Sequence, residues 1–90
     1  MKALLLIIEG KVQGVGMRYF IRKNALKLNL SGYAKNLPNG KVESLIIGEP
    51  ENVDQIIELI KNNSPGVVKN IDVIDYDGDF KRYVGKFEIM

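Results

Sequence analysis

Residues 3–18 have the sequence ALLLIIEGKVQGVGMR, which joins a short apolar run to a glycine-rich loop. The run is apolar, short and bounded by Gly10, so we expect a buried strand over Ala3–Glu9. Three glycines within seven positions then let the main chain turn sharply and leave its amides uncovered by side chains. A helix that follows such a loop offers unpartnered N–H groups and the positive end of its dipole. The stretch therefore predicts a site for a phosphate-sized anion, with Arg18 supplying a cation.

Two simpler interpretations of this stretch stay open on composition alone. Glycines often mark an ordinary turn between a strand and a helix, and Arg18 could be a solvated helix residue. The loop fits neither the Walker A pattern nor the G-x-G-x-x-G pattern. An arginine at a helix start is nevertheless unfavourable unless an anion lies there, which favours the functional interpretation.

Hydrophobic periodicity predicts the remaining elements. One face of a helix follows the loop, and a second helix comes after Pro50, which suits a first helical turn. Between them we expect two antiparallel strands joined by an Asn-Gly turn, and after the second helix two more strands. The apolar positions of the helices are Met17, Ile21, Ala25 and Leu28 in the first and Val53, Ile56, Ile57 and Ile60 in the second. The expected strands after the first are residues 30–36, 41–47, 67–75 and 83–89.

This order is β-α-β-β-α-β with a short fifth strand. It predicts an α+β fold, the ferredoxin-like split βαβ sandwich, with two helices on one face of a mostly antiparallel sheet. The length of 90 residues suits one domain, residues 1–90, with one modest core. Such a fold supports many functions and selects none of them.

The composition excludes several kinds of chemistry. The chain has no cysteine and no histidine, so it lacks a thiolate nucleophile, the commonest general base and the commonest metal ligand. We therefore expect no metal site. No apolar run is long enough to span a membrane, and no signal-peptide pattern is present, so we expect a cytoplasmic protein.

The charge distribution favours an anionic ligand. Residues 1–45 carry eight basic and two acidic side chains, whereas residues 46–90 carry five and nine. The glycine loop lies in the basic half, which attracts a small phosphate or a nucleic acid.

A second candidate is Asn36, at the end of the strand over residues 30–36. Its amide could simply bond the main chain of the following turn. It could instead orient a water molecule, because a carboxamide both donates and accepts hydrogen bonds.

With these residues in view, the chain resembles the acylphosphatase family. Residues 10–18 match the signature G-x-V-Q-G-V-x-[F/M]-R, and residues 32–48 match G-[F/Y]-[A/V/C]-[K/R]-N-x3-G-x-V-x5-G. Every fixed position agrees in both. The resemblance implies hydrolysis of the carboxyl–phosphate bond of an acyl phosphate without a metal or other cofactor. It implies that Arg18 holds the phosphoryl group and that Asn36 positions the attacking water. The phosphate-binding amides would be those of Gln13, Gly14, Val15, Gly16, Met17 and Arg18.

The reaction suits a chain without histidine or cysteine. The leaving carboxylate has a conjugate acid with a pKa of about 4 to 5, so it departs without being protonated. Phosphoryl transfer passes through a loose transition state with little bonding to the nucleophile, so a strong base contributes little. Positioning and charge stabilisation remain, and amides, a guanidinium and a carboxamide can supply both.

Three rival functions can be compared with this expectation. A nucleic-acid-binding sheet needs aromatic residues on its central strands, and the apolar runs at residues 4–8 and 45–47 contain none. A small-molecule regulatory domain rests on fold analogy alone. The third rival is an enzyme of the same kind acting on a protein-bound or carbamoyl phosphate. We expect a small-molecule acyl phosphate as substrate, no nucleic-acid or membrane partner, and a monomer.

Overall fold

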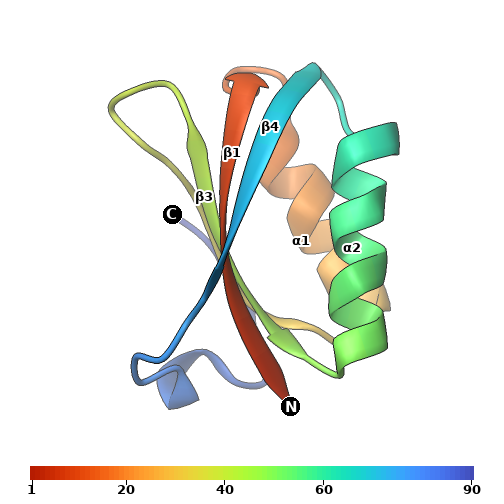
Figure 1. The fold of residues 1–90 in the computed structure, drawn as a ribbon, viewed down its shortest axis with the longest axis vertical. Coiled ribbons are helices and arrows are strands. Elements are labelled where there is room, and N and C mark those ends of the chain that lie inside the picture. The colour runs from red at the N-terminus through yellow and green to blue at the C-terminus, as the bar shows by residue number, and fades with distance from the viewer.

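The computed structural model describes residues 1–90 and has one five-stranded sheet with two helices (Figure 1). The elements are β1 (Lys2–Lys11), α1 (Met17–Lys27), β2 (Ser31–Asn36), β3 (Val42–Gly48), α2 (Pro50–Asn63), β4 (Val67–Asp75) and β5 (Phe87–Ile89), with a 3₁₀ turn, η1, over Lys81–Tyr83. Both helices lie on the same side of the twisted sheet. The predicted α+β ferredoxin-like fold is confirmed.

The sheet order is β4-β1-β3-β2-β5. β1 pairs antiparallel with β3 and with β4, and β2 pairs antiparallel with β3. β5 pairs parallel with β2, so the sheet is mostly antiparallel, as expected. This order places β1 and β3 in the centre and leaves β4 and β5 at the edges.

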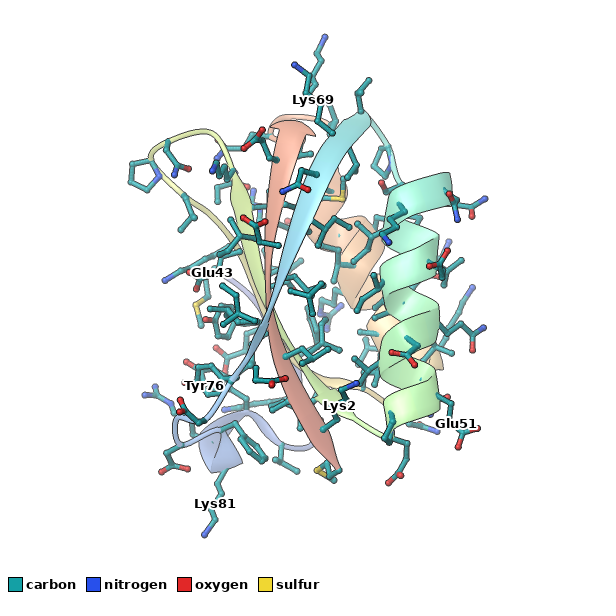
Figure 2. All side chains as sticks on the ribbon, in the orientation of Figure 1. Lys2, Glu43, Glu51, Lys69, Tyr76 and Lys81 are labelled. Atoms are coloured by element: carbon teal, nitrogen blue, oxygen red, sulfur yellow. The ribbon has the colours of Figure 1, made fainter.

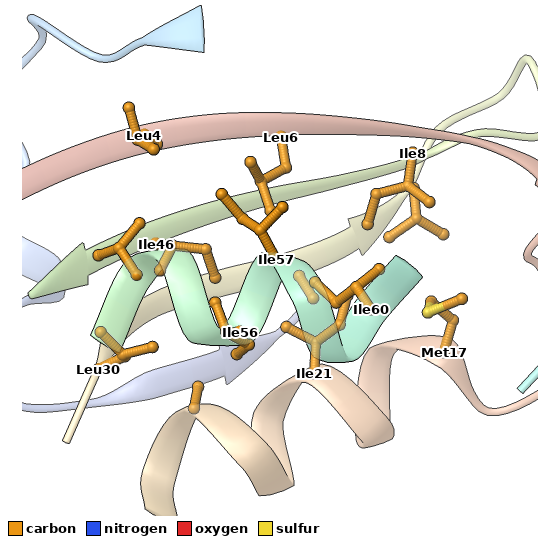
Figure 3. Close-up of a cluster of buried hydrophobic side chains, with 14 of the residues drawn as sticks. Leu4, Leu6, Ile8, Met17, Ile21, Leu30, Ile46, Ile56, Ile57 and Ile60 are labelled. Atoms are coloured by element: carbon orange, nitrogen blue, oxygen red, sulfur yellow. The ribbon is translucent and has the colours of Figure 1, made fainter. Parts of the chain in front are cut away.

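The core lies between the sheet and the helices. Sixteen buried residues form it, and they include the alternate residues Leu4, Leu6 and Ile8 of β1. Figure 3 draws 14 side chains of this buried cluster. Met17 and Ile21 of α1 pack into the same cluster, as their helical spacing predicts. Burying these side chains on one side of β1 fixes which face of every strand looks toward the helices, because side chains alternate along a strand.

A smaller apolar cluster covers part of the other face of the sheet. Tyr33, Leu45 and Ile47 are its buried members, and Tyr76 and Tyr83 pack against them. Glu43 and Tyr76 point away from the helices in Figure 2. The segment after β4 thus folds back over this face of the sheet and shields part of the face from solvent.

Two strand boundaries differ from the sequence prediction by more than one residue. The last strand begins at Phe87 rather than residue 83, because Lys81–Tyr83 forms the 3₁₀ turn η1, with Tyr83 packed beneath the sheet. The first strand runs on to Lys11, because β4 continues to pair with it beyond a bulge at Glu9/Gly10. At the bulge a side-chain Cβ on Gly10 would collide with the main-chain oxygen of Val67, so only glycine fits.

Neither helix is long and apolar enough to cross a membrane.

Candidate active site

The loop between β1 and α1 is anchored at both ends by buried apolar side chains. Val12 and Met17 are 1% and 2% exposed, whereas Gly14 and Gly16 between them are exposed. Gly14 has φ 73° and Gly16 has φ 86°, a left-handed conformation that glycine adopts without strain. A Cβ at either glycine would meet no atom within 4 Å, so the space above the loop is open.

The main-chain amides of this loop have no partner within the protein. The fifteen main-chain hydrogen bonds outside helices and strands include none donated by residues 13–18. At the helix start, Gly16 offers no side-chain cap, and the first turn of α1 contains no acidic residue. Six successive N–H groups are therefore without a protein partner at the positive end of the helix dipole, and the space beside Gly14 and Gly16 is open.

Arg18 lies in the first turn of α1 and reaches the end of the chain. Its Nη1 donates a hydrogen bond to the main-chain oxygen of Met90 at 2.9 Å. The N–H of Met90 in turn donates to the carbonyl of Ala34 at 2.9 Å. Since Ala34 lies in β2, this chain of contacts brings the guanidinium close to the strand that ends at Asn36.

Asn36 is the last residue of β2 and is exposed. It pairs with Val42, whose side chain belongs to the core between sheet and helices. Paired residues point to the same face of a sheet, so Asn36 faces the side on which α1 begins. The carboxamide that bonds the turn is instead that of Asn39, whose Oδ1 accepts from the N–H of Lys41 at 3.0 Å.

Gln13 joins the glycine loop to the β2–β3 hairpin. Its Nε2 donates to the carbonyl of Leu37 at 2.7 Å and to that of Lys41 at 2.9 Å. Figure 1 shows the loop after β1 and this hairpin at the same end of the molecule. The structure thus brings together the loop, Arg18 and the end of β2, which are the three regions that the sequence singled out.

The charges around the site are unequally compensated. Lys41 pairs with Glu9 at 3.2 Å and Lys35 with Glu43 at 3.5 Å. No Asp or Glu side chain lies within 4.0 Å of the Arg18 guanidinium, whose one hydrogen bond goes to the oxygen of Met90. Positive charge without an Asp or Glu partner therefore lies on both sides of the loop, on Lys11 at the end of β1 and on Arg18 in the first turn of α1.

The structure contains no deep pocket at this loop. Its two cavities, of about 190 and 240 Å³, lie beside Asn29 at the end of α1 and beside Lys69 between α2 and β4. No three His, Cys, Asp or Glu side chains lie together in a metal-binding group. The site is an open loop surface, suited to holding a small charged group by main-chain donors.

The sequence does not indicate three hydrogen bonds of the site. The sequence marks Gln13 only as a loop residue with a main-chain amide, and it does not indicate that Met90 contacts Arg18. Those partners are 24, 28 and 72 residues away along the chain, so no local pattern reports them. The one signal is that Gln13 is a fixed position of the first signature.

Comparison with known proteins shows the family to which the chain belongs. The family model described as Acylphosphatase matches residues 4–89. An acylphosphatase from Caldivirga maquilingensis is 40% identical over 86 residues, 91% of this chain and 90% of the relative. One from Acaryochloris marina is 43% identical over 79 residues, 86% and 85% of the two chains. The crystal structure of acylphosphatase from Bacillus subtilis superposes with a TM-score of 0.91 at 35% identity, covering 100% of this chain and 99% of the other. By its sequence and its fold, the chain belongs to the acylphosphatase family.

Proposed function

We propose that the chain carries out the family's reaction, hydrolysis of an acyl phosphate, with its loop amides and Arg18 on the phosphoryl group and Asn36 on the water. The reaction class follows from membership of the family, and the chain is an enzyme. The residue roles are the proposal. Products are a carboxylate and inorganic phosphate, and the water oxygen forms the new bond to phosphorus as the bond to the acyl oxygen breaks.

The observation that carries the assignment is the set of six unpartnered N–H groups at residues 13–18. Backbone donors fixed in an open loop at a helix N-terminus can hold a phosphoryl group without reorganising during the reaction. Charge that builds on the equatorial oxygens in the loose transition state would meet donors already in place.

Arg18 complements these donors. A planar guanidinium holds two oxygens of a phosphoryl group at once, and in this structure only Nη1 is engaged. The other N–H groups of the side chain are available to an anion above the loop. The positive charge of Arg18 also offsets the negative charge of the substrate, whereas Lys35 and Lys41 are paired with Glu43 and Glu9.

Asn36 fits the role of a water-orienting group. Its carboxamide is exposed on the side of the sheet where α1 begins, and the turn is already satisfied by Asn39. A neutral amide can accept from the water and donate to it, which aligns the lone pair with phosphorus. A strong base is unnecessary, because bonding to the nucleophile is slight in this transition state.

The test is release of phosphate from benzoyl phosphate by purified protein. We expect Asn36→Ala to lower kcat by about a hundredfold or more, and Arg18→Ala to do the same while weakening competitive inhibition by inorganic phosphate. Both proteins should keep the circular dichroism spectrum of the wild type. Lys23→Ala, an exposed cation on the same helix as Arg18, and Asn62→Ala, an exposed amide on α2, should change kcat by less than about twofold. Full turnover by Asn36→Ala would remove its assigned role.

We further propose that activity needs no metal, since none of the assigned groups is a typical metal ligand. Addition of a chelator should leave the rate of phosphate release unchanged. A loss of activity that Mg²⁺ restores would contradict this.

We also propose the setting in which the chain works: residues 1–90 as a single domain, monomeric and cytoplasmic, with a small-molecule acyl phosphate as substrate. Binding to nucleic acid is disfavoured because Tyr33, the aromatic residue of β2 on the helix-free face, is 8% exposed and stacks against Tyr83 at a ring distance of 5.1 Å. Light scattering tests the monomer, and a salt-dependent gel shift tests the absence of nucleic-acid binding.

A further inference from the structure

The side-chain amide of Gln13 donates two hydrogen bonds, and both go to the β2–β3 hairpin. Nε2 donates to the carbonyls of Leu37 and Lys41, the two residues on either side of the hairpin tip. The same Lys41 carbonyl accepts from the N–H of Leu37 at 2.8 Å. Leu37 directly follows Asn36, so the side chain of Gln13 is bonded to the carbonyl of the residue next to the proposed water-orienting residue.

The main chain of Gln13 belongs to a different part of the site. Its N–H is the first of the six free amides of the loop. Gln13 therefore has two roles in the proposed site. Its main-chain N–H is available to the phosphoryl group, and its side chain hydrogen-bonds the hairpin that follows Asn36. The exposed hairpin tip at Pro38, Asn39 and Gly40 has no packing of its own to set this distance.

We propose that Gln13 is a positioning residue whose side chain sets the phosphate-binding loop at the correct distance from Asn36. This inference rests on the proposed function, because it acts through the role given to Asn36. The attacking water must lie in line with the bond to the leaving carboxylate, and a misplacement of about 1 Å can cost about a hundredfold in rate. A carboxamide is suited to the task because both acceptors are carbonyls, which a carboxylate would repel.

The substitution Gln13→Ala should separate positioning from binding. The loop amides remain, so we expect KM for benzoyl phosphate and Ki for inorganic phosphate to change by less than about threefold. The loss of alignment should lower kcat by about tenfold to a hundredfold. Gln13→Met keeps the length of the side chain without its donors and should behave alike, which covers the case in which Gln13→Ala folds poorly. Gln55→Ala, at an exposed glutamine of α2, is the matched control and should have wild-type kinetics.

The decisive measurement is a double-mutant cycle on kcat with Asn36→Ala, run at high enzyme concentration. If Gln13 acts through Asn36, adding Gln13→Ala to Asn36→Ala should lower kcat by less than about twofold, because the group to be positioned is gone. An equal loss in both backgrounds, or a rise in KM and Ki with kcat unchanged, would overturn the positioning role.

The same data distinguish two failures. If Asn36→Ala is as active as the wild type, both the role of Asn36 and the positioning role of Gln13 fail. If Asn36→Ala is inactive while Gln13→Ala and Gln13→Met keep wild-type kcat, the proposed function stands and only the role of Gln13 fails.

Discussion

Arg18 occupies the first turn of α1, where the helix dipole is positive and a cation is unfavourable without an anion beside it. Its contact with the oxygen of Met90 offsets part of this cost. Only one nitrogen of the guanidinium makes that contact, so the side chain can bind a phosphoryl group with its other donors. A cation in the first turn destabilises α1 when no anion is present, and the same cation suits this end of the helix to an anionic substrate.

Replacing Arg18 with lysine tests whether geometry or charge matters. Lysine keeps the charge but cannot grip two oxygens from one planar group. We expect Arg18→Lys to lower kcat/KM by about tenfold to a hundredfold, the worth of one charge-assisted hydrogen bond. Steady-state kinetics with benzoyl phosphate measure it, and wild-type kcat/KM in this variant would show that charge alone is sufficient.

At the scale of secondary-structure elements, β2 and β3 have different neighbours on their two faces. Toward the helices they present the core and, at the end of β2, Asn36. On the opposite face the hydroxyl of Tyr33 donates to Glu43 at 2.6 Å, and the ring packs against Tyr83. Burial, followed by the hydrogen bond and charge of Glu43, raises the pKa of Tyr33 above the ordinary tyrosine value.

This shift predicts a loss of stability in alkaline solution. In the pH range above about 10 the unfolded chain loses the tyrosine proton before the folded chain does, so the free energy of unfolding falls as pH rises. Tyr33→Phe should be less stable than the wild type at pH 7, because the hydrogen bond is lost, and should show a smaller decrease between pH 9 and about 11. Urea unfolding across this range measures both, and parallel pH profiles for the two proteins would contradict the linkage.

At the scale of the whole molecule, the sheet order leaves β4 as a long edge strand with exposed apolar side chains. Val73 and Ile74 are 49% and 47% exposed. The charged residues Lys69, Asp72 and Asp75 interrupt this strand, and charges on an edge oppose pairing with another copy. We therefore expect these charges to keep β4 of one copy from pairing with β4 of another, which is consistent with the monomer that we propose.

Removing one of these charges should promote association of the native protein. Asp72→Val would leave an uninterrupted apolar run over residues 71–74, and we expect faster aggregation than in the wild type, measured by light scattering. The midpoint of urea unfolding should shift little, because Asp72 is exposed. Asp77→Val, at an exposed position after the end of β4, is the control; equal aggregation by both variants would show that the edge is not responsible.

Most of the fold can be predicted from local pattern. The spacing of Met17, Ile21 and Ala25 predicts α1, and all three are buried. The Asn-Gly turn predicts the β2–β3 hairpin, which forms at the expected residues. The last strand was predicted too long, because Tyr83 has strand-like composition but packs against Tyr33 from a 3₁₀ turn, a contact across 50 residues.

The sequence by itself determined the order of the elements and singled out the loop that we propose binds the anion. These features can be recognised from the sequence because they are local patterns or matters of composition: the hydrophobic periodicity, the glycine loop, and the absence of histidine and cysteine. Only the tertiary structure decided how the loop meets its partners: the bonds of Gln13 to the hairpin, the contact of Arg18 with Met90, and the parallel pairing of β5 with β2. These contacts join residues far apart along the chain, and they form only after the buried faces of sheet and helices have set the register of every strand.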